Sequence, residues 1–309
     1  MEKQENIEPK KKIFDGSIDS LEQYLAIVKE LSKQYPSNTS LYNPTQSRFL
    51  FRGQANTEHK LLPSLFRENH DEIHSSKYFN SEIDILQDFI NEALAYNTAV
   101  QPDNLVQWTE IAQHYGVPTR FLDWTSNSLV ALYFACIKDD NFDGAIWVFN
   151  IENYYGSHYI KENIEKTKNL YATINKLITN DKDSDLPQYP FVFIPRYIDS
   201  RMAAQSSWFM TWGSNRRPLD EMINENDYMQ LNLEPKFFAG KRVRENYRSL
   251  AFLFKININS FQKRFILRDL EHIGINAKTL FPGMDGVGKY IERKYRSDLL
   301  EQFLWEKNQ

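Results

Sequence analysis

The sequence predicts one α+β domain with a mixed, mainly antiparallel core sheet and helical decoration. Short apolar runs rich in aromatic and β-branched residues, typical of strands, alternate with segments of helical spacing. No internal repeat and no clear linker divides the 309 residues, which are enough to bury a full-sized core. We therefore expect a mobile, charged lead-in over residues 1–14 and a single domain over residues 15–309.

The elements of this domain are predicted from the period of their apolar residues. Strands are expected at residues 49–54, 119–125, 144–150, 191–195 and 250–258. Helices are expected at residues 18–31, 78–95, 108–113, 129–137, 262–273 and 287–305. Asp15 or Ser17 would cap the first helix, Gly274 would end the fifth, and 201–212 reads as a short turn or helix before an extended segment. The remaining segments are predicted to be polar loops or turns: 152–186, with an exposed loop at 182–185, then 213–235 and 279–286.

Composition limits the classes of function. A formal net charge of −4 argues against a protein held on nucleic acid mainly by a basic surface, but it leaves a local basic patch open. The first residues lack the apolar core of a signal peptide, and no apolar run is long enough to span a bilayer. The single cysteine, Cys136, lies in the most apolar helical segment and cannot form an intrachain disulfide. We therefore expect a cytoplasmic protein with a buried thiol and no membrane partner.

The stretch from Glu110 to Cys136 combines a polar turn, a short strand and an apolar helix. A strand followed by a helix start is where α/β proteins present side chains and free backbone N–H groups to a ligand. Six polar or charged residues gather at this junction: His114, Arg120, Asp123, Thr125, Ser126 and Ser128. Because buried polar groups must be paired, the cluster predicts either a hydrogen-bonded structural network or a binding site.

A second candidate is Phe51-Arg52-Gly53-Gln54, where a predicted strand ends in an arginine and a glycine. The permanent charge of Arg52 must meet a carboxylate, a phosphate or carbonyl oxygens. Gly53 lets another backbone or a ligand approach closely. Arg-Gly pairs are also common in ordinary turns, so this segment alone leaves its role open.

Four short motifs lie between residue 49 and about residue 290. They are Phe51-Arg52-Gly53-Gln54, the run His114 to Ala135, the set Arg201, Met202, Gln205 and Phe209, and the run Thr279 to Gly286. Together they resemble the motifs of FRG-domain proteins, with Ser207 and Met284 standing where that family has glycine and leucine. The resemblance covers most of the chain, and it identifies a family without naming a reaction.

The order of these motifs has a more distant similarity to ADP-ribosyltransferases of the Arg–Ser–Glu type. Those split-sheet folds carry an arginine ending the first core strand, Ser-Thr-Ser on a later strand before a helix, and a glutamate opening a third strand. The similarity places Arg52 at the first position, Thr125-Ser126 with Ser128 at the second, and Gln205 at the third. It implies NAD as a substrate without a metal, a guanidinium on its pyrophosphate, and hydroxyls that order the ribose and nicotinamide.

This similarity supplies a full set of candidate site residues. The catalytic candidates are Arg52, Ser126, Gln205 and Asp123, and the cofactor-binding candidates are Arg52, Gly53, Gln54, His114, Arg120, Thr125 and Ser128. Gln205 departs from the pattern, because a neutral amide cannot act as a general base or balance the positive charge that develops on the ribose. Asp123 or Asp285 would then supply the acid. Asp123 has an alternative reading as the structural ion-pair partner of Arg120.

Three classes of function remain open from the sequence. The first is an NAD-consuming ADP-ribosyltransferase that modifies nucleic acid, RNA favoured over DNA, or a protein. Such an enzyme would suit a toxin or phage-defence effector, for which an antitoxin partner is expected. The second is a nuclease or other nucleic-acid-processing enzyme that uses His114, Arg120 and Asp123. The third is a non-enzymatic module that holds a nucleotide or a partner at the polar junction.

The tryptophans near the third motif bear on the nucleic-acid target. Trp208 and Trp212 precede Arg216 and Arg217 in the chain. Aromatic and guanidinium groups in this arrangement would stack on bases. Packing in the core explains the two tryptophans equally well.

Overall fold

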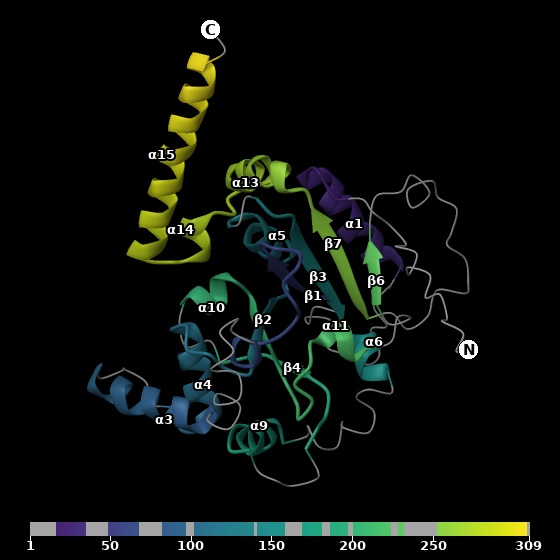
Figure 1. The fold of residues 1–309 in the computed structure, drawn as a ribbon, viewed down its shortest axis with the longest axis vertical. Helices are drawn as coiled ribbons and strands as arrows, with labels where there is room; N and C mark the ends of the chain where they lie inside the picture. The colour runs from purple at the N-terminus through teal and green to yellow at the C-terminus, as the bar shows by residue number, and fades with distance from the viewer. Residues whose placement is uncertain are drawn as a thin grey trace, which may run out of the picture.

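The computed structural model describes residues 17–34, 49–67, 82–96, 102–138, 141–157, 169–180, 186–196, 200–223, 228–231 and 252–307 (Figure 1). The predicted lead-in over residues 1–14 and the predicted cap Asp15 lie outside these ranges. The described part of the chain forms one seven-stranded sheet with helices on both faces. None of the helices in this part is long and apolar enough to cross a membrane.

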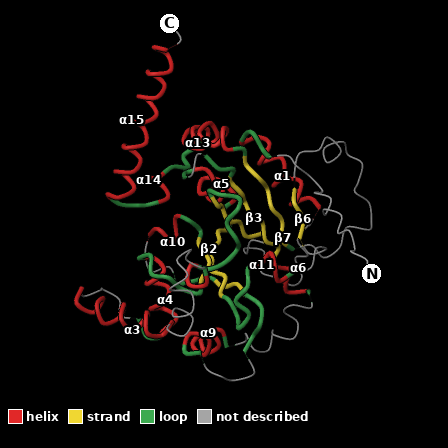
Figure 2. The backbone as a smooth tube through the Cα atoms, in the orientation of Figure 1, coloured by secondary structure: helices red, strands yellow, loops and turns green. Residues whose placement is uncertain are grey.

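The sheet, whose strands are yellow in Figure 2, has the strand order β4-β5-β2-β1-β3-β7-β6. Its strands are β1 (Phe49–Gln54), β2 (Phe121–Thr125), β3 (Gly144–Asn150), β4 (Phe191–Phe193), β5 (Ser207–Thr211), β6 (Tyr228–Leu231) and β7 (Leu253–Ile258). Neighbouring strands are antiparallel, except that β6 runs parallel to β7. The predicted α+β fold with a mainly antiparallel core sheet is therefore confirmed.

Side chains of the central strands alternate between two hydrophobic cores. Phe51 and Val148 belong to one core, whereas their neighbours Leu50 and Phe149 belong to the other. The first core is covered by α1 (Leu21–Gln34), α5 (Ser128–Cys136) and α13 (Lys263–His272). The second is covered by η1 (Ser64–Phe66), α3 (Glu82–Ala93), α4 (Leu105–His114), α6 (Ile151–Gly156), α9 (Leu170–Ile178) and α11 (Leu219–Met222).

The shorter helices and the C-terminal helix complete the description. They are η2 (Leu94–Tyr96), α10 (Ser200–Ala204), η4 (Ser260–Gln262), α14 (Ala277–Leu280) and α15 (Met284–Lys307). Figure 1 shows that α10 and α14 lie near the sheet, whereas α15 extends away from the body of the molecule. The segment between α14 and α15 therefore leads from the core to an outlying helix.

The sheet is nearly interrupted between β1 and β2. These strands pair at a single position, Phe51 opposite Thr125, whereas β1 pairs with β3 along its whole length. Beyond that position the guanidinium of Arg52 takes over the contact, because its Nη1 donates a hydrogen bond to the backbone oxygen of Asp123 at 2.5 Å. The separation of the two strands creates the space in which the candidate site lies.

Several predicted boundaries were wrong. The first helix begins at Leu21, where the hydroxyl of Ser20 accepts from the backbone N–H of Gln23 at 3.3 Å, so Ser20 takes the place that we expected for Ser17. Ile18 forms a bridge to Ile258 instead of opening the helix. The last helix begins at Met284, inside the segment expected to be a turn.

Four elements lie in segments that we expected to be polar loops. The range 152–186 contains most of α6 and the whole of α9, whose residues Ile174, Leu177 and Ile178 are buried. The range 213–235 contains α11 and β6. Both ranges contain many polar residues, which hide the helical and strand periods.

Candidate functional site

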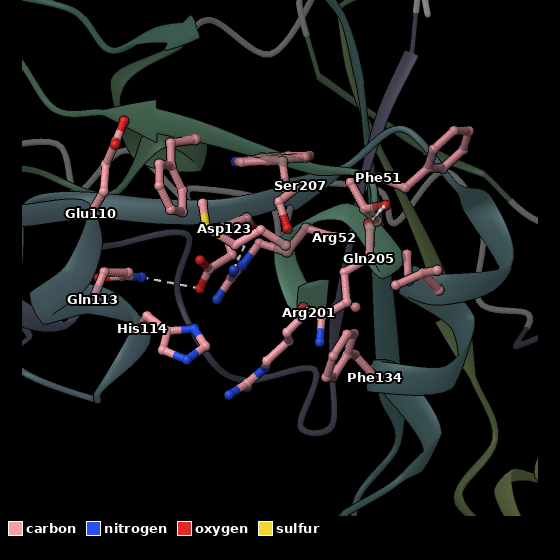
Figure 3. A pocket seen from close by; sticks show the side chains of 17 residues that line it. Phe51, Arg52, Glu110, Gln113, His114, Asp123, Phe134, Arg201, Gln205 and Ser207 are labelled. Atoms are coloured by element: carbon pink, nitrogen blue, oxygen red, sulfur yellow. Dashed lines mark hydrogen bonds between the residues drawn. The ribbon is translucent and has the colours of Figure 1, made fainter. Parts of the chain in front are cut away.

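A pocket of about 250 Å³ opens where β1 and β2 separate (Figure 3). Its wall combines segments that are far apart in the chain: β1, the end of α4, β2, α5, α10 and β5. The residues that line it include Arg52, Gly53, Glu110, Gln113, His114, Asp123, Thr125, Phe134, Arg201 and Gln205. Residues from three of the four sequence motifs therefore meet at one place.

Arg52 lies at the floor of this pocket. Besides the bond to the Asp123 carbonyl, its Nε is buried and has no hydrogen-bond partner in the described part of the protein. Burial lowers the pKa of Arg52 to about 10, while the nearby carboxylate of Asp123 acts in the opposite direction. Arg52 therefore keeps its positive charge at neutral pH and holds an unsatisfied donor, which normally costs about 1–3 kcal/mol.

Position 53 requires a glycine because α5 packs directly on β1. A Cβ atom at this position would lie 1.9 Å from the backbone oxygen of Ala131 and 2.6 Å from the backbone nitrogen of Ala135. Real side chains cannot approach a helix backbone so closely. The glycine thus lets α5 pack closely against the strand that carries Arg52.

Thr125 connects β2 to the start of β5. Its hydroxyl donates to the backbone oxygen of Gln205 at 2.6 Å and accepts from the backbone N–H of Asn127 at 3.0 Å. Asn127 in turn caps α5, because its side chain accepts from the N–H groups of Leu129 and Val130. The Thr125 hydroxyl is therefore committed to structure as well as lining the pocket.

Gln113 and Asp123 form a polar link across the pocket. The Gln113 amide donates to a carboxylate oxygen of Asp123 at 3.1 Å and accepts from the hydroxyl of Thr119. Helix α4 ends at His114, the residue after Gln113. Gly116 follows with φ +84°, and the backbone N–H of Val117 donates to the carbonyl of Ala112. This turn fixes the end of α4, so that Gln113 holds the Asp123 side chain beside Arg52 (Figure 3).

The structure does not bring Arg120 to the pocket. Its buried guanidinium binds both oxygens of Glu82 and donates to the backbone oxygens of Trp212 and Leu177. The alternative pairing with Asp123 is therefore wrong, because the partner of Arg120 is Glu82 on α3. The order of residues in the sequence could not reveal this pairing, because Arg120 lies just before β2 and its side chain turns away from the pocket.

Four other predicted residues also lie outside the set of residues that line the pocket. Gln54 accepts from the indole N–H of Trp147 and donates to the Lys60 carbonyl, so its amide is a buried structural link. Ser126 binds the Ser206 carbonyl through its backbone N–H, next to Thr125. Ser128 opens α5, and its carbonyl accepts from the hydroxyl of Tyr24. Asp285 lies exposed in the first turn of α15, also outside the lining residues.

Glu110 is a pocket residue that sequence reasoning missed. Burial raises the pKa of its carboxyl to about 7, against a smaller opposing effect from the backbone N–H and the charge of Arg196. Figure 3 shows its carboxylate turned away from that of Asp123, so the two acids do not act as one pair. The signal in the sequence was a glutamate next to apolar helix positions, between Trp108 and the pair Ile111 and Ala112.

The fourth motif supports Gln205 from outside the sheet. The Gln205 amide donates to the backbone oxygen of Leu280 at 3.0 Å, which ties α10 to α14. The next residue, Phe281, contacts the guanidinium of Arg201 at 4.7 Å from the ring centroid. Phe281 also packs edge-on against Phe134 of the pocket wall. The run Thr279 to Gly286 therefore flanks the pocket without lining it.

The tryptophans near the third motif do not form a surface for bases. Trp212 is fully buried, and its indole N–H donates to the Arg217 carbonyl. Trp208 packs against the same core in a partly buried position, and Arg216 lies over the ring of Phe66. Core packing accounts for these residues.

Comparisons with known proteins agree with one part of the sequence interpretation. Neither the curated proteins nor the solved structures contain a match to this chain. A family model does match: residues 47–144 correspond to the FRG domain. This range holds β1, α4, β2 and α5, which supply Arg52, His114, Asp123 and Thr125 to the pocket wall. Residues 47–144 of this chain are therefore similar to the FRG domain, the family that the four sequence motifs resemble, and this range contains the first two of those motifs.

Proposed function

We propose that this protein is an NAD-consuming ADP-ribosyltransferase whose active site is the pocket between β1 and β2. The observation that supports it is the meeting of Arg52, Thr125 and Gln205 around one pocket with Asp123. Arg52 lies on β1, Thr125 ends β2 just before α5, and Gln205 lies just before β5, which is the order that the Arg–Ser–Glu similarity leads us to expect.

Asp123 takes the chemical role that Gln205 cannot fill. Cleavage of the bond between nicotinamide and ribose leaves positive charge on the sugar, and an ionised carboxylate stabilises it. An acceptor hydroxyl or amine then bonds to the same ribose carbon and releases its proton, so that NAD and acceptor give ADP-ribosyl-acceptor, nicotinamide and a proton. Gln113 holds the carboxylate in place, and Gln205 would position a ribose hydroxyl.

The dimensions of the pocket limit which part of NAD it takes. Pockets that enclose a drug-sized ligand measure roughly 300–1,000 Å³. The pocket of about 250 Å³ lies just below that range. In this proposal it encloses the nicotinamide and its ribose, while the rest of the dinucleotide extends outward. For the acceptor we propose RNA before DNA or protein, in the cytoplasm.

Nicotinamide release from NAD tests the proposal directly. We expect release by the wild-type protein and a loss of roughly 100-fold or more in Asp123→Asn, because the neutral amide no longer balances the developing charge. The substitution keeps an oxygen that accepts from Gln113, so the fold is retained. Asp88→Asn on the exposed side of α3 is the matched control and should release nicotinamide at the wild-type rate.

Labelled NAD identifies the acceptor in the same reaction. Transfer of label to RNA, DNA or protein assigns the target, and release without transfer indicates hydrolysis. If the wild-type protein leaves NAD intact under all these conditions, the proposal is wrong.

A second candidate function rests on His114 and Asp123, which line the same pocket. Such a pair would act as general acid and base in metal-independent RNA cleavage. Within the described ranges no group of three or more His, Cys, Asp or Glu residues is arranged to hold a metal ion. Shortening of RNA without NAD, lost in His114→Ala, would favour this function over ADP-ribosyl transfer.

A further inference from the structure

A second guanidinium stands at the exposed side of the pocket. Arg201 on α10 is half-buried, lines the pocket and extends toward His114 (Figure 3). Its charge rests on the ring of Phe281, and it forms no ion pair with any residue in the described ranges. Arg52 differs, because its guanidinium is engaged by the Asp123 carbonyl and lies beneath the opening.

Lys289 brings another positive charge to the same ring. Its ammonium lies 4.9 Å from the centroid of Phe281, close to the 4.7 Å distance of the Arg201 guanidinium. The side chain is exposed and has no ion-pair partner among the residues that the structure describes. Asp285, one turn earlier on α15, is an acid near Lys289 along that helix, and no bond joins them.

Gly286 explains how Lys289 reaches this position. A Cβ atom there would lie 1.8 Å from the backbone oxygen of Phe281, so only glycine allows α15 to pack so closely on the preceding turn. The close packing places the next turn of α15, and with it Lys289, over the Phe281 ring. The fourth motif thus supplies the Phe281 ring that both cations contact, in addition to supporting Gln205.

We propose that Arg201 and Lys289 bind the diphosphate of the dinucleotide whose nicotinamide end occupies the pocket. This inference rests on the proposed function and assigns the phosphates to residues other than Arg52. Guanidinium and ammonium groups are the side chains that bind phosphate oxygens most strongly, Arg in fork geometry and Lys as a compact charge. Phe134 lines the pocket and packs edge-on against Phe281, so a ligand that extends past Phe134 approaches the ring that both cations contact.

Binding of ADP-ribose, measured by isothermal titration calorimetry, tests this assignment. ADP-ribose carries the diphosphate but no bond that the enzyme can cleave, so binding is read without turnover. We expect Arg201→Ala to weaken binding about 10-fold and Lys289→Ala about 3-fold, with both effects reduced at high salt. Affinity for nicotinamide alone should not change.

Two other cation–ring pairs serve as matched controls. Arg264 lies 4.7 Å from the ring centroid of Phe265, and Lys278 lies 5.3 Å from that of Tyr290, and neither lines the pocket. Arg264→Ala and Lys278→Ala remove the same contacts and should bind ADP-ribose like the wild type. Thermal denaturation of Arg201→Ala should give a midpoint close to the wild-type value, and Arg201→Lys should restore part of the affinity.

The outcomes separate this inference from the proposed function. Wild-type affinity for ADP-ribose in both Arg201→Ala and Lys289→Ala, or no binding by the wild type, overturns the inference. Binding that depends on Arg201 and Lys289 in a protein that never releases nicotinamide from NAD keeps the inference and overturns the transferase.

Discussion

Replacing Glu110 by glutamine should change how the stability of this protein depends on pH. In the folded protein burial raises the pKa of Glu110 to about 7, compared with about 4.3 for an unperturbed glutamate in an unfolded chain. The native state therefore keeps a proton that the unfolded state loses. Between these two values the free energy of unfolding falls as pH rises, because the native state binds more protons than the unfolded state.

The size of the effect follows from the two pKa values. Each pKa unit corresponds to about 1.4 kcal/mol, so the free energy of unfolding should fall by about 2–3 kcal/mol between pH 5 and pH 8 through Glu110 alone. Glu110→Gln has no proton to lose, so this fall should disappear. The buried amide also needs hydrogen-bond partners, and the lack of them lowers the free energy of unfolding of Glu110→Gln by an amount that does not change with pH.

Urea denaturation followed by tryptophan fluorescence at pH 5, 6, 7 and 8 measures the effect. The difference in the free energy of unfolding between wild type and Glu110→Gln should shrink as pH rises, because the wild type alone becomes less stable. Glu92→Gln, on the exposed side of α3, should keep the wild-type dependence on pH. A constant difference between wild type and Glu110→Gln from pH 5 to pH 8 would refute the assignment of this buried proton.

Two further predictions concern residues that shape the site from behind. Gly53→Ala should lower stability by about 1–3 kcal/mol or more, because a Cβ would overlap the Ala131 backbone oxygen. In the control Gly156→Ala the added Cβ meets nothing within 4 Å, so the stability of this variant should stay within about 1 kcal/mol of wild type. Thermal denaturation measures both. Arg120→Met should lower the free energy of unfolding by about 3–5 kcal/mol, because Glu82 stays buried without its partner. Adding Glu82→Leu should recover part of this stability. Equal stability of the single and double variants would show that the ion pair is not the cause.

Much of the central sheet was predictable because its strands have a strong pattern. The runs at 49–54 and 144–150 are apolar and bounded by polar residues, and both are strands in the structure. Helix α9 was missed because only one of its faces is buried and the surrounding residues are polar. Strand β6 was missed because it pairs in parallel with β7, a contact between segments that the local sequence does not indicate.

The candidate site was predictable only as a set of motifs. The motifs placed Arg52, His114, Asp123 and Gln205 on the list, and the structure brings them around one pocket. Arg120 was a candidate as well, but the sequence does not show toward which face of the sheet a side chain at the start of a strand points. Arg201 is a further pocket residue whose place depends on contacts with Phe281, about eighty residues away, which no local pattern can show.

The bond between Gln205 and the Leu280 carbonyl has a consequence for where this protein can be cut. The stretch that matches the FRG domain ends at residue 144, before α10, β5 and α14 begin. An excised fragment of that stretch would leave the edge of β2 unpaired where β5 normally lies, and such edges invite association between chains. The smallest autonomous unit that retains the whole cavity must therefore extend at least to the turn after α14, well past the boundary that family similarity alone would suggest.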